Sequence, residues 1–168
     1  MKSQIGVALG IVTNLKDPQG EGRIKVKFTS FLDGGPESTW AAIAAPMAGG
    51  SRGVFFMPEV GDEVLVAFDR GHFDHPYVVG FLWNGVDKPP VNDPHLRLIR
   101  SVNGHEIAIY DPPISQGDKG YIRLQDSHGN IVELANAHIT IKSVGTITID
   151  APNIAINGRP VAPQAKPI

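Results

Sequence analysis

The C-terminal quarter of the chain, residues 130–158, carries apolar residues in pairs that lie two positions apart. Side chains at positions i and i+2 of a strand share one face, so each pair marks a short strand with one apolar face. The pairs return every seven to eight residues, with turn-forming residues between them. So short a period is typical of a β-helix or β-solenoid rather than a sandwich of hairpins. The paired residues are Val132, Leu134, Ile139, Ile141, Ile147, Ile149, Ile154 and Ile156.

One copy of this array cannot cover its own apolar face. Each strand offers a single apolar pair, and burial of that pair offsets the cost of ordering the backbone only if the face is covered. A single-chain solenoid covers the face by coiling widely, which requires longer coils than one short strand and a turn. Three copies around a common axis cover it by symmetry. We therefore predict that the eight paired residues form the core of an intertwined homotrimeric β-prism, with a single-chain solenoid as the alternative.

The composition agrees with an all-β chain of one domain or two small ones. The 168 residues include 19 Gly and 14 Pro, which favour short strands and many turns. The 15 basic and 17 acidic residues nearly balance, so no overall field attracts nucleic acid or an anionic membrane. The absence of cysteine excludes disulfides and thiolate chemistry. No stretch approaches the ~18 apolar residues of a membrane-spanning helix.

The N-terminal half contains five short stretches with strand-like alternation. Residues 23–28 alternate strictly, with Ile24, Val26 and Phe28 on one face and basic residues on the other. Five short strands within roughly 80 residues are typical of an OB-type barrel. We predict this five-stranded OB-fold barrel over residues 1–85. The expected strands are 4–15, 23–28, 39–45, 63–68 and 76–82.

Residues 86–94 are Pro-rich and polar, and we assign residues 86–103 to a linker between two domains, in which residues 96–99 could form a short strand. The predicted spike occupies residues 104–157. Its first part contains looser apolar pairs, Ile107 with Ile109 and Ile122 with Leu124. The Pro-rich residues 158–168 are expected to form an extended cap or tail that does not continue the ladder.

No residue pattern predicts a catalytic, metal or cofactor site. His72, Asp74 and His75 cluster in a loop, but a structural zinc site usually needs four ligands. His138 could meet its copies on a trimer axis or face solvent. The carboxylates at turns show no spacing that selects a catalytic pair. We expect a protein that is not an enzyme and has no cofactor.

A basic strand could serve as a nucleic-acid surface of an OB barrel. Lys25 and Lys27 would supply the charge, and Phe28 with Trp40 the stacking. Strict alternation, however, places Phe28 on the face opposite to the lysines. A solvated or protein-docking strand is therefore the preferred interpretation.

Five short motifs together resemble one family. They are PEVGDEVLV at 58–66, PYVVG at 76–80, NG at 84–85, NGHEI at 103–107 and GNIVEL at 129–134. The combination resembles the central spike proteins of contractile injection machines. These are phage baseplate assembly protein V, phage tail spikes with a hub partner, and the valine-glycine repeat spike of type VI secretion. The resemblance covers nearly the whole chain, residues 5–157.

The resemblance implies an OB-fold followed by a triple-stranded β-helix. The OB-fold docks on a trimeric baseplate hub, and the homotrimeric β-helix pierces the target cell envelope. Relative to some members, the chain lacks a fused hub domain, a lysozyme-like insertion and an H-x-H pair near its C-terminus. The lone His138 therefore implies a blunt end capped by a PAAR-type tip protein, without an iron-holding apex.

The resemblance also implies a location and leaves alternatives open. We expect synthesis in the bacterial cytoplasm without a signal peptide, followed by assembly into a virion tail baseplate or an injection-system particle. The sequence does not separate a phage tail from an extracellular or type VI-like system. The first alternative function is an OB-fold module that binds nucleic acid or glycan and has a trimerising β-helical tail. The second is an envelope-degrading enzyme on a β-helix.

Overall fold

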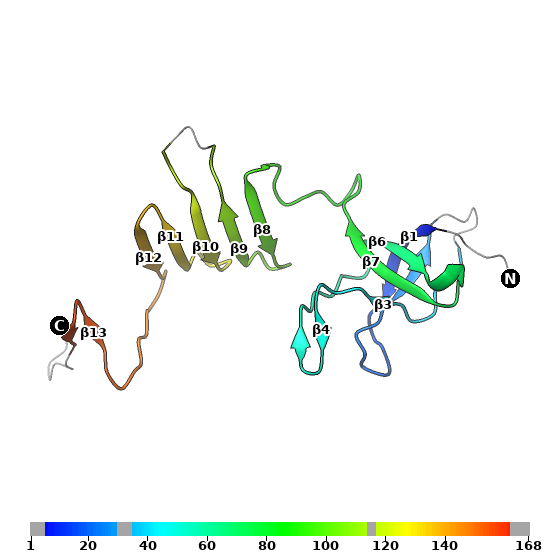
Figure 1. Ribbon diagram of the computed structural model, residues 1–168, viewed down its shortest axis with the longest axis horizontal. Helices are drawn as coiled ribbons and strands as arrows, with labels where there is room; N and C mark the ends of the chain where they lie inside the picture. The colour runs from blue at the N-terminus through cyan, green and yellow to red at the C-terminus, as the bar shows by residue number, and fades with distance from the viewer. Residues whose placement is uncertain (1–5, 30–34, 114–116, 162–168) are drawn as a thin grey trace. The chain divides into compact units, whose positions relative to one another are not determined.

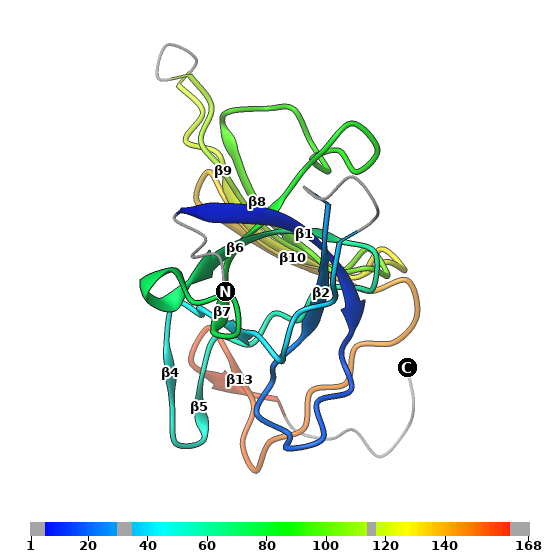
Figure 2. The ribbon, with the colours of Figure 1, turned by 90° about the vertical axis from the view of Figure 1, so that its right-hand side faces the viewer.

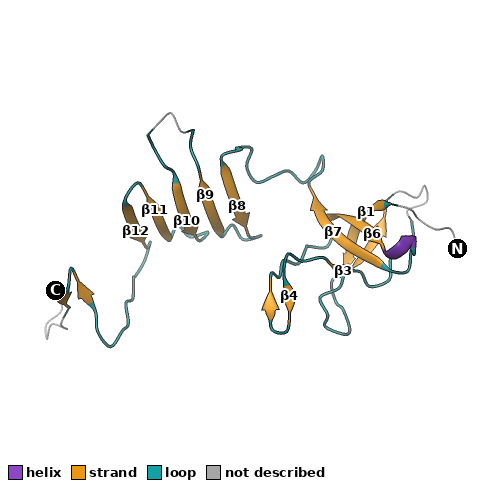
Figure 3. Cartoon of the chain, in the orientation of Figure 1, coloured by secondary structure: helices purple, strands orange, loops and turns teal. Residues whose placement is uncertain are grey.

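The computed structural model describes residues 6–29, 35–113 and 117–161. The chain divides into two compact units, Met1–Pro89 and Pro90–Ile168. Within the described residues both units are built from strands, and the only helical element is a 3-10 turn at Asp69–Gly71 (Figure 3). No helix in this part of the chain is long and apolar enough to cross a membrane. The prediction of an all-β chain is confirmed.

The first unit contains a five-stranded sheet with the order β2-β1-β6-β7-β3. All neighbouring strands are antiparallel except β3 and β7, which are parallel. Backbone bridges from Ile24 to Ala41 and from Lys27 to Glu37 join the two ends of the sheet, so it curls into a small barrel (Figure 2). A separate short hairpin is formed by β4 (Ala48–Gly49) and β5 (Arg52–Gly53). The sheet strands are β1 (Val7–Asn14), β2 (Lys25–Phe28), β3 (Ala42–Ile43), β6 (Glu63–Phe68) and β7 (Pro76–Leu82).

The interior of the barrel is filled by alternate side chains of its strands. Every second residue of β6 is buried, and the exposed fractions of Val64 and Val66 are 0%. Phe28 lies at the centre, with its ring centroid 5.6 Å from that of Phe68 and 4.9 Å from that of Phe73. The buried hydroxyl of Ser38 accepts the N–H of Val26 at 3.0 Å. The barrel core is therefore apolar, and Ser38, the polar residue buried in it, is hydrogen-bonded.

A carboxylate organises the turn between β1 and β2. Asp17 accepts the backbone N–H groups of Gln19 and Glu21 at 3.1 and 3.0 Å, and the guanidinium Nε of Arg23 at 3.0 Å. Its side chain is only 4% exposed. The hydrogen bonds from the Arg23 side chain hold the pKa of Asp17 well below its usual range.

The second unit is a five-stranded antiparallel meander with the order β12-β11-β10-β9-β8 (Figure 1). Its tightest turn, Asn136-Ala137, has positive φ at both residues, as a two-residue type I′ hairpin requires. A short hairpin near the C-terminus pairs β13 with β14. The strands are β8 (Leu96–Arg100), β9 (Glu106–Tyr110), β10 (Tyr121–Gln125), β11 (Ile131–Ala135), β12 (His138–Lys142), β13 (Ala155–Ile156) and β14 (Arg159–Pro160).

Several expected boundaries differ in the structure. The strand expected at 39–45 is reduced to Ala42–Ile43, because only these residues pair with β7. β8 confirms the short strand expected at 96–99, inside the segment 86–103 that the sequence assigned to a linker. Pro160 joins a ladder as part of β14 rather than a free tail. Ile147 and Ile149 lie in no strand. The beginning of the expected strand 4–15 and the end of the tail 158–168 fall outside the described residues.

Candidate interaction face

The most unusual surface of the second unit is one face of its sheet. Strand register aligns apolar side chains from all five strands into two rows that cross the sheet, which we call the apolar columns. The first column contains Ile99, Ile107, Leu124, Val132 and Ile141. The second contains Ile109, Ile122, Leu134 and Ile139, and Arg97 occupies its β8 position.

The apolar columns are uncovered in the single chain. Their exposed fractions run from 39% at Val132 to 73% at Ile139. Scattered apolar side chains on a surface are ordinary, but a contiguous two-column face of nine large aliphatic side chains is not. A face of this kind marks an interaction site.

The opposite face of the same sheet completes its contacts within the chain. Arg100 pairs with Glu106 across β8 and β9, where Nε lies 2.6 Å from Oε1. The rings of Tyr110 and Tyr121 stack with centroids 5.4 Å apart, and the guanidinium of Arg123 lies 4.2 Å from the Tyr121 centroid. The polar side chains of this face thus make their contacts within the chain, whereas the apolar side chains of the other face are exposed.

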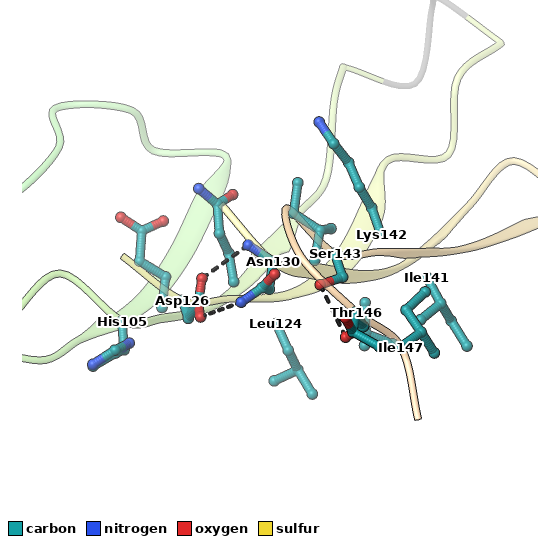
Figure 4. A pocket seen from close by; sticks show the side chains of 13 residues that line it. His105, Leu124, Asp126, Asn130, Ile141, Lys142, Ser143, Thr146 and Ile147 are labelled. Carbon is teal, nitrogen blue, oxygen red and sulfur yellow. Dashed lines mark hydrogen bonds between the residues drawn. The ribbon is translucent and has the colours of Figure 1, made fainter. Parts of the chain in front are cut away.

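The turns beside the columns are held by short carboxylate hydrogen bonds. Asp126 accepts the backbone N–H of Asn130 at 2.8 Å and its side-chain Nδ2 at 2.7 Å (Figure 4). These bonds lower the pKa of Asp126. The Oδ1 of Asn130 in turn accepts the N–H of Val144 at 3.0 Å, which fixes the start of the segment after β12.

Two shallow hollows border the columns. The first, of about 490 Å³, is lined by Leu124, Val132, Ile141 and Ile147 together with polar residues of the neighbouring turns (Figure 4). The second, of about 560 Å³, is lined by Ile109, Ile122, Leu134 and Ile139 among others. Both are open grooves along the exposed aliphatic rows.

The structure separates the eight predicted core residues into two groups. Val132, Leu134, Ile139 and Ile141 lie together on the apolar columns. The other four, Ile147, Ile149, Ile154 and Ile156, follow the sheet; Ile147 lines the first hollow. Five column residues were left out of the predicted core, although four of them carry the same i, i+2 spacing. They are Ile99, Ile107, Ile109, Ile122 and Leu124.

The basic strand of the barrel offers no stacking surface. Phe28 is fully buried, as the alternation predicts. Lys25 is engaged, with Nζ 2.9 Å from Oε2 of Glu37 and 5.5 Å from the ring centroid of Trp40. Binding of single-stranded nucleic acid needs a free positive charge beside an exposed aromatic ring. Here the ring of Phe28 is buried away from the lysines, and the charge of Lys25 is paired with Glu37.

The histidine loop of the barrel brings two imidazoles near each other. The ring centroids of His72 and His75 lie 6.1 Å apart. Among the residues that the structure describes, no three histidine or carboxylate side chains gather as a metal-binding group.

Comparison with known proteins identifies relatives of the barrel and of part of the sheet. Residues 8–83 match the family of the type VI secretion system/phage-baseplate injector OB domain. The chain is 28% identical over 88 residues to type VI secretion system spike protein VgrG2a of Pseudomonas aeruginosa, and 28% identical over 94 residues to actin cross-linking toxin VgrG1 of Vibrio cholerae. It is 31% identical over 137 residues to spike protein VgrG4b of P. aeruginosa.

These matches differ in how much of this chain they cover. They include 51%, 50% and 74% of it, respectively, and only 10%, 9% and 16% of the relatives. Unit one holds 89 of 168 residues, or 53%, so the 74% match to VgrG4b must include residues of the second unit. The similarity thus extends beyond the barrel.

Proposed function

Because this chain belongs to the family of phage-baseplate and type VI secretion spike proteins, we propose that it is the structural central spike of a contractile injection particle. The barrel docks on a trimeric baseplate hub. The sheet unit forms the shaft that pierces the target cell envelope. The chain spans about a tenth to a sixth of the length of the relatives it matches.

The observation that carries this proposal is the uncovered pair of apolar columns. Three copies that turn the same face to a shared axis bury all nine side chains of each chain and leave the charged faces in water. Complete burial of one such side chain contributes about 1.5–3 kcal/mol. A dry aliphatic axis surrounded by hydrogen-bonded sheets is also stiff, because closely packed interiors have low compressibility.

The outer face of the barrel supports docking on another protein. Five large apolar side chains on β1 and β7 point away from the core and are 39% to 60% exposed. They are Val7, Leu9, Tyr77, Val79 and Phe81. Aromatic and aliphatic side chains gathered on one face favour a protein partner. The hub takes this position in the proposal, and a PAAR-type tip protein takes the C-terminal end.

The proposed role is mechanical rather than catalytic. One relative is named as an actin cross-linking toxin, but the matched region covers only 9% of that relative's length. No toxin activity is therefore transferred to this chain. Its function resides in shape, symmetry and stiffness.

The proposal is tested by the solution mass of the full chain. Three chains of 18.0 kDa give 54 kDa, measured by light scattering on a sizing column. A monomer at micromolar concentration overturns the trimeric spike. A parallel titration with single-stranded DNA is expected to show no salt-dependent binding, whereas such binding would favour the OB-module alternative.

A further inference from the structure

A third hollow lies at one end of the barrel, where β6 begins and β7 ends. Glu63, the first residue of β6, pairs with Leu82, the last residue of β7. Trp83 follows directly and is 68% exposed. These three residues line a hollow of about 310 Å³, which we call the Trp83 hollow. Its other lining residues are Asp62, Phe81, Asp87 and Lys88.

The walls of the Trp83 hollow are fixed by hydrogen bonds of the neighbouring turns. The carbonyl of Asp62 accepts the N–H of Val12 at 2.9 Å, and its Oδ2 accepts the N–H of Glu59 at 2.9 Å. On the other side, Oδ1 of Asn84 accepts the N–H of Asp87 at 2.8 Å. Both aspartates are therefore held in place before a ligand arrives, so that binding loses little free energy to ordering the walls.

The charge of the hollow is negative. Three carboxylates and the single ammonium of Lys88 line it, which leaves two negative charges in excess. Among the residues that the structure describes, neither Glu63 nor Lys88 forms an ion pair. Glu63 is half-buried. A carboxylate in this position gains from an incoming cation that donates hydrogen bonds to it.

The chain elsewhere combines a carboxylate and an aromatic ring around a cation. In the barrel, Nζ of Lys25 lies 2.9 Å from Oε2 of Glu37 and 5.5 Å from the ring centroid of Trp40. In the second unit, the guanidinium of Arg123 lies 4.2 Å from the ring centroid of Tyr121 and donates to a glutamate on β11. Both combinations are complete within one chain.

The Trp83 hollow has the ring and the carboxylates of this combination without the cation. In the described parts of the chain, the cations that lie over an aromatic ring are those of Lys25 and Arg123, and neither is at Trp83. The missing component is a positively charged group that fits beside an exposed indole.

We propose that the Trp83 hollow binds an arginine side chain of a partner protein. Tryptophan is the aromatic ring that attracts cations most strongly. The planar guanidinium can stack on this ring while its N–H groups donate to Glu63, and it is more weakly hydrated than an ammonium. The volume lies at the lower end of the roughly 300–1,000 Å³ of ligand pockets, so a single side chain suits it. This inference concerns the barrel alone and does not depend on the trimer.

Fluorine NMR of the full chain labelled with fluorotryptophan tests the proposal. The chain has two tryptophans, so Trp40 and Trp83 give one signal each. The probe is a capped pentapeptide with one arginine between glycines. We expect a saturable shift of the Trp83 signal with an affinity on the order of millimolar, from one cation–π contact and one charge-assisted hydrogen bond. The Trp40 signal should not move, because Lys25 already lies over that ring.

Matched probes separate charge from shape. Citrulline in place of arginine keeps the shape and removes the charge, so this peptide should give no saturable shift. A lysine peptide should bind more weakly than the arginine peptide. Equal binding of the citrulline and arginine peptides overturns the proposal. A shift of the Trp83 signal by chitotetraose, with none by the arginine peptide, overturns it in favour of glycan binding.

Three substitutions test the lining residues. Glu63→Gln keeps the shape and should weaken arginine binding roughly tenfold or more. Lys88→Gln should strengthen it, because a competing positive charge is removed. Glu59→Gln is the matched control, since Glu59 is exposed and lies outside the hollow. An unmoved Trp40 signal shows that each variant keeps a folded barrel.

The results distinguish this inference from the proposed function. A Glu63→Gln protein that binds the arginine peptide like wild type overturns the arginine site and leaves the spike intact. A monomeric wild-type chain that binds the peptide supports the arginine site and overturns only the trimeric spike.

Discussion

Arg123 on β10 and Glu133 on β11 face each other with Nε 2.6 Å from Oε2, on the side of the sheet opposite to the apolar columns. Arg100 and Glu106 repeat this arrangement on β8 and β9. The charged side of the second unit therefore completes its interactions in one chain. Among the described residues, the aliphatic side has no covering segment in that chain, and this asymmetry is the basis of the predictions about assembly.

Adjacent residues of β12 give a matched test of the apolar columns. Ile141 is 62% exposed in the single chain and Thr140 is exposed on the other face, so an isolated chain should tolerate lysine equally at both positions. In a trimer, Ile141→Lys places three charges beside one axis. Each copy also loses the favourable free energy of burying one isoleucine side chain, about 1.5–3 kcal/mol. We expect Ile141→Lys to reduce the particle from 54 to 18.0 kDa and Thr140→Lys to leave it intact. A full-size, heat-resistant Ile141→Lys particle would show that this face is not the axis.

The barrel core gives a prediction about stability. Phe28 is fully buried and contacts the rings of Phe68 and Phe73, so Phe28→Ala should lower the free energy of unfolding by about 3–5 kcal/mol. Val79 on the outer face of β7 is 45% exposed, and Val79→Ala should change it by no more than about 0.5 kcal/mol. Urea unfolding of a fragment ending at Pro89, followed by the fluorescence of Trp40 and Trp83, measures both. Equal effects of the two substitutions would contradict the described core.

The Asp17 turn gives a prediction about pH. The Arg23 side chain lowers the pKa of Asp17 in the folded state, so its contribution is fully present above the unfolded pKa of about 3.9 and is lost as pH falls below that value. Asp17→Asn should therefore destabilise the fragment at pH 7, and the difference from wild type should shrink between about pH 4 and pH 2. Thermal melts across this range test it. A difference that stays constant with pH would exclude the carboxylate charge as its cause.

Gly120 precedes β10 with φ +77°, and a Cβ at this position would overlap the carbonyl oxygen of Tyr110. Gly120→Ala should therefore separate β9 from β10 and destabilise the second unit by more than about 1 kcal/mol. Gly85 has open space around a Cβ, and Gly85→Ala serves as the neutral control. Melting curves and solution mass of both variants check this expectation. A Gly120→Ala protein that melts and assembles like wild type would contradict the geometry of this hairpin.

Much of the fold follows from local pattern. Strict alternation at 23–28 places Phe28 in the core and Lys25 outside it, and the structure agrees. The i, i+2 pairs identify Val132 with Leu134 and Ile139 with Ile141 as residues of one sheet face. The column residues outside the predicted core lie on β8, β9 and β10, where the sequence pattern is less regular. Ile99 lacks an apolar partner because Arg97 occupies that position, and the pairs on β9 and β10 are separated by a long loop that hides their period.

The sequence by itself determined the strands and their faces, because a period of two assigns each side chain to one side of the backbone. Only the tertiary structure decided which strands find partners within the chain. Ile139-Thr140-Ile141 and Ile147-Thr148-Ile149 carry the same pattern, yet only the first follows a two-residue turn that returns it to β11. The second continues past the open edge of the sheet. Pairing depends on where the chain reverses in space, and side-chain alternation alone does not contain that information.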